Sequence, residues 1–86
     1  MGVDSTDSDQ AALPALPLPF DGFFARHHAE MVRALTLTIG DVELARDAAA
    51  EGFARALERW ATVSGYANPN GWVYRVGLNW ARSGRR

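Results

Sequence analysis

The stretch IGDVELARDAAAEGFARALERW, residues 39–60, decides the fold because it holds the end of one helix and nearly all of the next. Glycine often ends a helix and aspartate is a preferred cap, so Gly40 and Asp41 predict a turn between two helices. The second helix should extend for about 19 residues, because apolar side chains recur there at helical spacing. Its predicted buried stripe consists of Val42, Ala45, Ala49, Phe53, Ala56 and Trp60.

The other side of this second helix is charged and carries more acid than base. The acidic residues are Asp41, Glu43, Asp47, Glu51 and Glu58, against Arg46, Arg55 and Arg59. The simplest interpretation is a solvated face stabilised by pairs such as Glu51 and Arg55, which are four residues apart. Gly52 lies in the middle of this predicted helix, where glycine costs about 1 kcal/mol relative to alanine. Its presence favours a close approach by another helix at this point.

The residues before Gly40 also repeat with helical spacing. The predicted stripe is Phe20, Phe24, Met31, Leu35 and Ile39, joined by Phe23, Val32 and His28. We predict a helix from residue 22 to residue 39, with Asp21 as its cap. His27 and His28 are adjacent, but neighbouring helical side chains point about 100° apart and no carboxylate stands at a ligand-like spacing. We therefore expect ordinary, partly buried histidines and no metal.

After the second helix, residues 61–67 (ATVSGYA) have no helical repeat and predict a loop. Asn68 is a capping residue type and Pro69 suits a first turn, so a third helix should continue to Ser83 and end at Gly84. Its predicted inward residues are Trp72, Val73, Val76, Gly77 and Trp80, and its predicted outward residues are Tyr74, Arg75, Leu78, Asn79 and Arg82. The fold class that follows is all-α, a small three-helix bundle.

The composition limits the chain to one small domain. It has 86 residues, of which 48% are apolar, and no cysteine. Disulfides and thiolate metal sites are therefore excluded, and a reducing compartment, by default the cytoplasm, is expected. Residues 1–19 are acidic and contain proline, which predicts a disordered tail before a helical domain of residues 20–86. No stretch resembles a signal peptide or a transmembrane span, so we expect no membrane partner.

Charge is distributed unevenly along the chain. Residues 1–21 contain four aspartates and no basic residue, whereas residues 61–86 contain four arginines and no acidic residue. A basic C-terminal part suggests a partner that is an anion, most often nucleic acid. A solvated basic helix end is the alternative interpretation.

The outward side of the third helix combines the groups that hold single-stranded DNA. Tyr74 and the loop residue Tyr66 offer stacking surfaces, and arginines bind phosphates. Asn79 can read a base edge. A helix face that is aromatic is more often core, so Trp72 and Trp80 are expected in the core.

These residues also carry a resemblance to a known family. The runs FDGFFARHHAEMVRAL, LTIGDVELARDAAAEGFARALERW and NPNGWVYRVGLNWARSGRR resemble region two of bacterial RNA polymerase sigma factors of the extracytoplasmic-function group. The resemblance covers residues 20–86. Its landmarks, in order, are Gly40, Asp41, Asp47, Ala48, Glu51, Phe53, Arg55, Ala56, Asn68, Pro69, Trp72, Tyr74, Arg75, Val76 and Asn79.

The resemblance implies a transcription initiation factor that needs no cofactor and has no catalytic residue. Its partners would be core RNA polymerase, through the clamp helices of the β′ subunit, the non-template strand of the minus-ten promoter element, and an anti-sigma factor. The implied polymerase contacts are Asp47, Ala50, Glu51, Ala54, Arg55 and Glu58. The implied DNA contacts are Tyr66, Asn68, Trp72, Tyr74, Arg75, Asn79, Arg82, Arg85 and Arg86. Family members continue into a helix-turn-helix domain that reads the minus-thirty-five element and is absent here, so we expect a fragment of a longer sigma factor.

Two other interpretations remain open. The chain could be a sigma-like interaction module that binds an anti-sigma factor or another regulator without engaging DNA. Departures from the family pattern at Ala50, Leu57 and Leu78 favour this alternative. An enzyme is disfavoured, because the only candidate carboxylate pair is Asp47 and Glu51, and such pairs on a helix surface are generally solvated.

Overall fold

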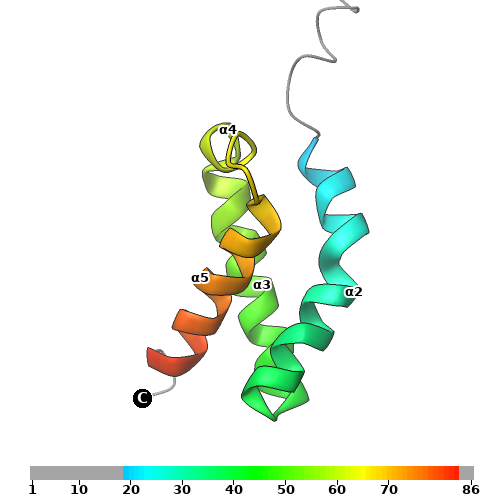
Figure 1. Ribbon diagram of the computed structural model, residues 1–86, viewed down its shortest axis with the longest axis vertical. Coiled ribbons are helices and arrows are strands. Elements are labelled where there is room, and N and C mark those ends of the chain that lie inside the picture. Colours follow the sequence, from blue (N-terminus) through cyan, green and yellow to red (C-terminus); the bar gives the residue numbers. More distant parts are fainter. Residues whose placement is uncertain (1–18, 84–86) are drawn as a thin grey trace, which may run out of the picture.

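The computed structural model describes residues 19–83, which form four α-helices and no strand (Figure 1). The helices are α2 (Phe20–Ile39), α3 (Val42–Glu58), α4 (Trp60–Val63) and α5 (Pro69–Ser83). For this part of the chain the all-α prediction is confirmed. The predicted tail, apart from Pro19, and the predicted helix end at Gly84 lie outside the described residues.

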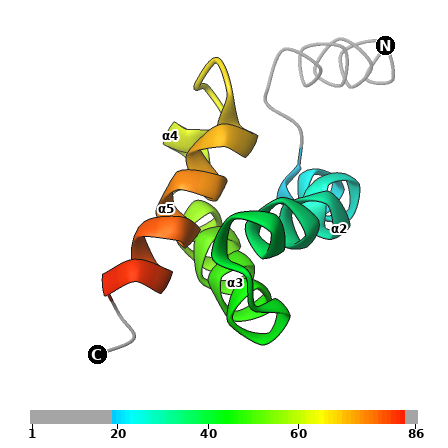
Figure 2. The same ribbon diagram turned by 60° about the horizontal axis from the view of Figure 1, so that its bottom comes forward.

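Of the three long helices, α3 is central, and α2 and α5 pack on it. It lies between α2 and α5 in both views of the molecule and packs extensively on each of them (Figures 1 and 2). Contact between α2 and α5 is much less extensive. None of the helices between residues 19 and 83 has the length and apolar character needed to cross a bilayer.

The turn between α2 and α3 forms as predicted. Gly40 adopts a left-handed conformation with φ of 82°, and its N–H donates to the carbonyl oxygen of Thr36 at 2.7 Å. A side chain at this φ would be strained, which is why glycine suits the position. The Asp41 carboxylate then accepts a hydrogen bond from the backbone N–H of Leu44 at 3.1 Å, so Asp41 caps α3.

The start of α2 differs from the prediction. The helix begins at Phe20, and Pro19 rather than Asp21 occupies the capping position, without a side-chain hydrogen bond. The carbonyl oxygen of Pro19 accepts a hydrogen bond from the N–H of Phe23 at 3.2 Å, so the helical hydrogen bonds begin two residues before Asp21. Asp21 instead lies in the first turn, where a negative charge is favoured by the helix dipole.

The predicted loop of residues 61–67 is partly wrong. Trp60–Val63 form the single turn α4, and α3 ends at Glu58 after 17 residues rather than 19. The N–H of Val63 donates to the carbonyl oxygen of Arg59 at 2.8 Å, and the Val63 side chain is fully buried. Burial of an apolar side chain stabilises this turn, and a short turn carries too few residues to show a helical repeat.

The core contains side chains from all four helices. The buried apolar residues are Phe23, Met31, Leu35, Ala45, Ala48, Ala49, Phe53, Ala56, Val63, Val73 and Ala81. Two residues of the predicted stripes are more open than expected, because Phe24 is 37% exposed and Val42 is 43% exposed. Phe24 stays partly open although its ring lies 5.0 Å from that of Phe53 on α3, and Val42 is the first residue of α3.

The backbones of α3 and α5 meet closely at two glycines. A Cβ atom on Gly52 would lie 2.7 Å from the carbonyl oxygen of Val73, and one on Gly77 would lie 2.6 Å from the carbonyl oxygen of Ala48. Either separation is shorter than real Cβ contacts allow. The close approach predicted at Gly52 is therefore confirmed, and Gly77 is its counterpart on α5.

Candidate nucleic-acid interface

The first turn of α5 is fixed by Asn68. Its side-chain Oδ1 accepts from the N–H of Gly71 at 2.9 Å, and its carbonyl oxygen accepts from the N–H of Trp72 at 3.1 Å. Pro69 follows as the first residue of the helix. The predicted cap is confirmed, and the Oδ1 atom of this predicted DNA contact is already engaged within the protein.

Replacing Asn68 with alanine is expected to cost about 1 kcal/mol of the free energy of unfolding, because the capping hydrogen bond can no longer form. In a domain of this size that corresponds to a fall in Tm of about 4–8 °C. Thermal unfolding followed by circular dichroism measures it. Asn68→Asp keeps a capping oxygen and is the matched control. An alanine variant as stable as the wild type would contradict the role of the cap.

A pocket of about 300 Å³ lies between α2 and the start of α5. Asn70 lines this pocket, and its Oδ1 atom is buried without a hydrogen-bond partner among the described residues. Glu30 and Asn70 are not among the predicted site residues, because the sequence does not show that this part of α2 lies beside α5. The lining residues are Glu30, Met31, Ala34, Asn68, Asn70, Gly71 and Tyr74.

Tyr74 does not project outward as predicted. It is half-buried against the core, and its hydroxyl forms a hydrogen bond with the Thr38 hydroxyl at 2.5 Å. The helical repeat alone places Tyr74 about 100° from the buried Val73. Because α2 as well as α3 packs on α5, that direction is partly covered.

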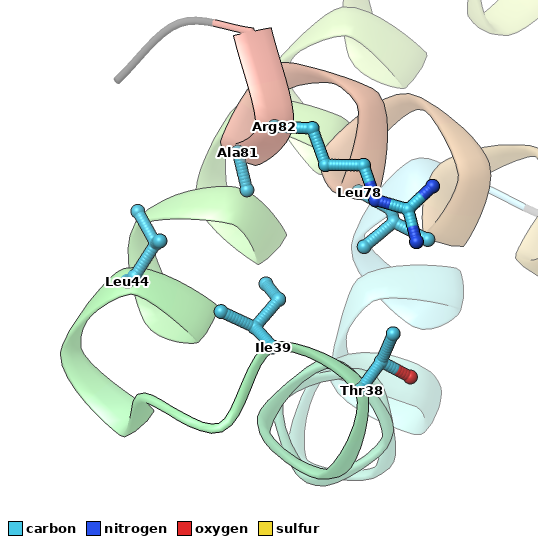
Figure 3. A pocket seen from close by; sticks show the side chains of 6 residues that line it. All are labelled: Thr38, Ile39, Leu44, Leu78, Ala81 and Arg82. Carbon is cyan, nitrogen blue, oxygen red and sulfur yellow. The ribbon is translucent and has the colours of Figure 1, made fainter. Parts of the chain in front are cut away.

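Leu78 is also inward rather than outward, since it packs against the core and lines a second pocket of about 360 Å³. Figure 3 shows the six lining side chains, which come from the end of α2, the start of α3 and the last turns of α5. Arg82 supplies the only charged group among them. They are Thr38, Ile39, Leu44, Leu78, Ala81 and Arg82.

The outward face of α5 is made by Arg75, Asn79 and Arg82, all of which are exposed. Spacings of four and three residues place these side chains along one side of the helix. The face therefore offers two guanidinium groups and an amide in a row. The predicted contacts Arg85 and Arg86 lie outside the described residues.

The predicted aromatic contacts Tyr66 and Trp72 lie next to each other. Their ring centroids are 6.3 Å apart, and Tyr66 is 44% exposed. Trp72 is half-buried and packs against the core, as expected, while also lining a pocket of about 370 Å³. The other residues of that pocket are Arg55, Glu58, Arg59 and Val76.

The predicted polymerase contacts lie on α3. Asp47, Ala50, Ala54 and Glu58 are exposed. The Nε atom of Arg55 donates to the Glu51 carboxylate at 2.8 Å, and both side chains are partly open to solvent. Exposed pairs of this kind contribute about 0–1 kcal/mol, so Glu51 and Arg55 need little energy to separate and meet a partner.

The residues Ala50 and Ala54 also belong to a feature that the sequence pattern did not predict. Together with α2 they line a wholly apolar depression of about 230 Å³, here called the apolar groove. The signal in the sequence was Leu57, an apolar residue outside the predicted buried stripe of α3. The groove is lined by Phe20, Phe24, Ala50, Phe53, Ala54 and Leu57.

The two histidines are half-buried, as expected from the sequence. The His27 ring lies 5.0 Å from that of Phe23, and the His28 ring lies 4.7 Å from that of Phe24. Within residues 19–83 no three histidine, aspartate or glutamate side chains are grouped so that they could hold a metal ion. The ring contacts with Phe23 and Phe24 show that both histidines pack as aromatic surfaces.

Comparison with known proteins gives no match, whether with models of protein families, with curated proteins or with solved structures.

Proposed function

We propose that this chain is the region-two module of an extracytoplasmic-function sigma factor, which binds core RNA polymerase and opens the minus-ten promoter element. The observation that carries the proposal is the arrangement of α5. Its exposed Arg75, Asn79 and Arg82 share one helix with the pocket lined by Asn68 and Asn70. The helix that carries these phosphate-binding groups therefore also borders a pocket about large enough for an unstacked base.

On this proposal, DNA opening is driven by capture of the single strand. Guanidinium groups at Arg75 and Arg82 hold phosphates, and Asn79 contacts a base edge. Tyr66 gives a stacking surface beside Trp72, and an unstacked base enters the pocket near Asn70. Unstacking costs a few kcal/mol, which stacking and hydrogen bonds to the protein offset. Tyr74 is a wall of the pocket rather than a free stacking ring.

The polymerase contact is assigned to α3. Asp47, Glu51 and Glu58 give its outer side a negative character, and Ala50 and Ala54 leave room for a partner helix to approach. Acidic side chains at such a contact steer a basic partner surface into place and speed association. This face belongs to a different helix from the DNA-binding groups, so both partners could be held at once.

A paired titration of the 86-residue chain tests the proposal. Fluorescence anisotropy would follow binding to a β′ clamp-helix fragment and to single-stranded minus-ten oligonucleotides at low and moderate salt. We expect binding to both, with the DNA affinity falling steeply as salt rises. The proposal would be overturned if the chain bound only one of the two partners, or neither.

Replacing Arg75 or Arg82 with alanine is expected to weaken single-strand binding several-fold for every sequence. The log–log salt slope should become shallower by about 0.7 for each phosphate that the protein no longer neutralises. Titration against the same oligonucleotides measures both quantities. Tyr66→Ala should instead change the preference between sequences. Arg33→Ala, an exposed arginine on α2, is the control. If neither α5 variant changes affinity or slope, the DNA surface is wrongly assigned.

A second candidate function is a regulator-binding module that does not engage DNA. The apolar groove favours this function, because it offers a protein partner an exposed apolar surface. Leu57, which is 55% exposed, belongs to this surface and lies on the helix that the first proposal assigns to polymerase. Such a module would retain binding to a protein partner and show no affinity for single-stranded DNA at low salt. The paired titration therefore separates the two functions.

A further inference from the structure

The apolar groove is a surface without a partner among residues 19–83. Its six lining residues are all apolar and come from the start of α2 and the second half of α3. Phe24 and Leu57 are 37% and 55% exposed, so water reaches both sides of the groove. A contiguous apolar surface that stays open to water is a candidate contact surface.

We propose that residues 11–18 of this same chain bind in the apolar groove. The segment AALPALPLP, residues 11–19, contains only alanine, leucine and proline, which matches a lining that has no polar side chain. It continues directly into Phe20, the first residue of the groove. The attachment gives the segment an effective concentration in the millimolar range at this site, which favours it over a partner from solution.

The backbone geometry at the junction suits this arrangement. Pro19 has φ of −60° and ψ of 147°, which are polyproline-type values. Polyproline segments characteristically bind in grooves lined by aromatic rings, and Phe20, Phe24 and Phe53 line this one. Because a polyproline helix repeats every three residues, Leu13 and Leu16 would project from the same side toward the phenylalanines.

The lengths are also compatible. Eight residues in polyproline conformation span about 25 Å. The groove follows α3 from Ala50 to Leu57, which is about 10 Å along a helix. The segment can therefore reverse direction before Phe20 and still cover the groove.

Cysteine trapping in the full chain tests the contact, since the protein contains no cysteine of its own. The test variant combines Leu16→Cys with Ala54→Cys in the groove. The control combines Leu16→Cys with Ala29→Cys, an exposed position of α2 outside the groove. Under mild oxidation we expect the Ala54 pair to close an intramolecular disulfide roughly tenfold faster than the control, as measured by mass spectrometry. Adding Leu13→Ser should remove most of that advantage.

Equal rates for the two pairs would overturn the proposal, as would a product that is mainly a disulfide-linked dimer, which would assign the groove to a second copy. A second measurement needs no cysteine. In methyl NMR spectra of the full chain, Leu13→Ser with Leu16→Ser should shift the Leu57 methyl signals and leave those of Leu37, 81% exposed, unchanged. Unchanged Leu57 signals would also exclude the contact.

One consequence rests on the proposed function. A segment in the groove would cover Ala50 and Ala54, so it would compete with polymerase, and the Leu13→Ser, Leu16→Ser variant should bind the clamp-helix fragment more tightly. The trapping and NMR experiments do not involve polymerase. If they succeed and the variant shows no gain, the polymerase assignment fails and the intramolecular contact stands.

Discussion

Replacing Leu35 with alanine is expected to lower the free energy of unfolding by about 2–5 kcal/mol. Leu35 is fully buried, and its side chain lies against Gly77 at the place where α2, α3 and α5 meet. Removing it forfeits the transfer free energy of the side chain and leaves a cavity that three helices cannot easily fill. For a small domain, whose total stability is of the same order, much of the population could unfold.

Urea denaturation at low temperature, followed by circular dichroism, measures this effect. Leu37→Ala is the matched control, because Leu37 is two residues away in the same helix but 81% exposed. It should change the stability by no more than about 0.5 kcal/mol. If the two variants are equally stable, the orientation of α2 is wrong.

Gly77→Ala is expected to destabilise the domain by about 1–3 kcal/mol, although alanine is the better helix former. The added methyl would lie 2.6 Å from the carbonyl oxygen of Ala48, so α3 and α5 would have to move apart along their shared contact. Gly52→Ala should act in the same direction, because its methyl would meet the carbonyl oxygen of Val73. Backbone atoms cannot turn aside as a flexible side chain can.

Gly22→Ala gives the control of opposite sign. Gly22 lies in α2 with no atom within 4 Å of the position of an added Cβ. Alanine there should stabilise the helix by about 0.5–1 kcal/mol. Thermal unfolding of the variants should therefore move Tm upward for Gly22→Ala and downward for Gly77→Ala. A rise in Tm for Gly77→Ala would mean that the two helices are further apart than described.

Features fixed by local chemistry could be predicted from the sequence. Gly40 and Asp41 define the turn before α3, and Asn68 and Pro69 define the start of α5, because each acts on backbone groups only a few residues away. The close approach at Gly52 could also be inferred, since an unfavourable residue in mid-helix needs a reason from outside the helix.

Features that depend on which helices are neighbours could not be predicted. Tyr74 and Leu78 appear outward when α5 is read as a helix with one buried stripe, but α5 has neighbours on two sides. The same limit applies to the pocket beside Asn70 and to Glu30 within it. These two residues are far apart in the sequence, and nothing in either local pattern refers to the other.

The central position of α3 has a consequence for local unfolding. Because α2 and α5 each pack on α3 much more than on one another, either outer helix can open while α3 keeps its remaining partner. The backbone amides of α3 should then exchange with solvent only when the whole domain unfolds, whereas those of α2 and α5 exchange through smaller, separate openings. On the proposed function, a strand of DNA bound to α5 could thus loosen that helix without disturbing the surface of α3 that faces α2.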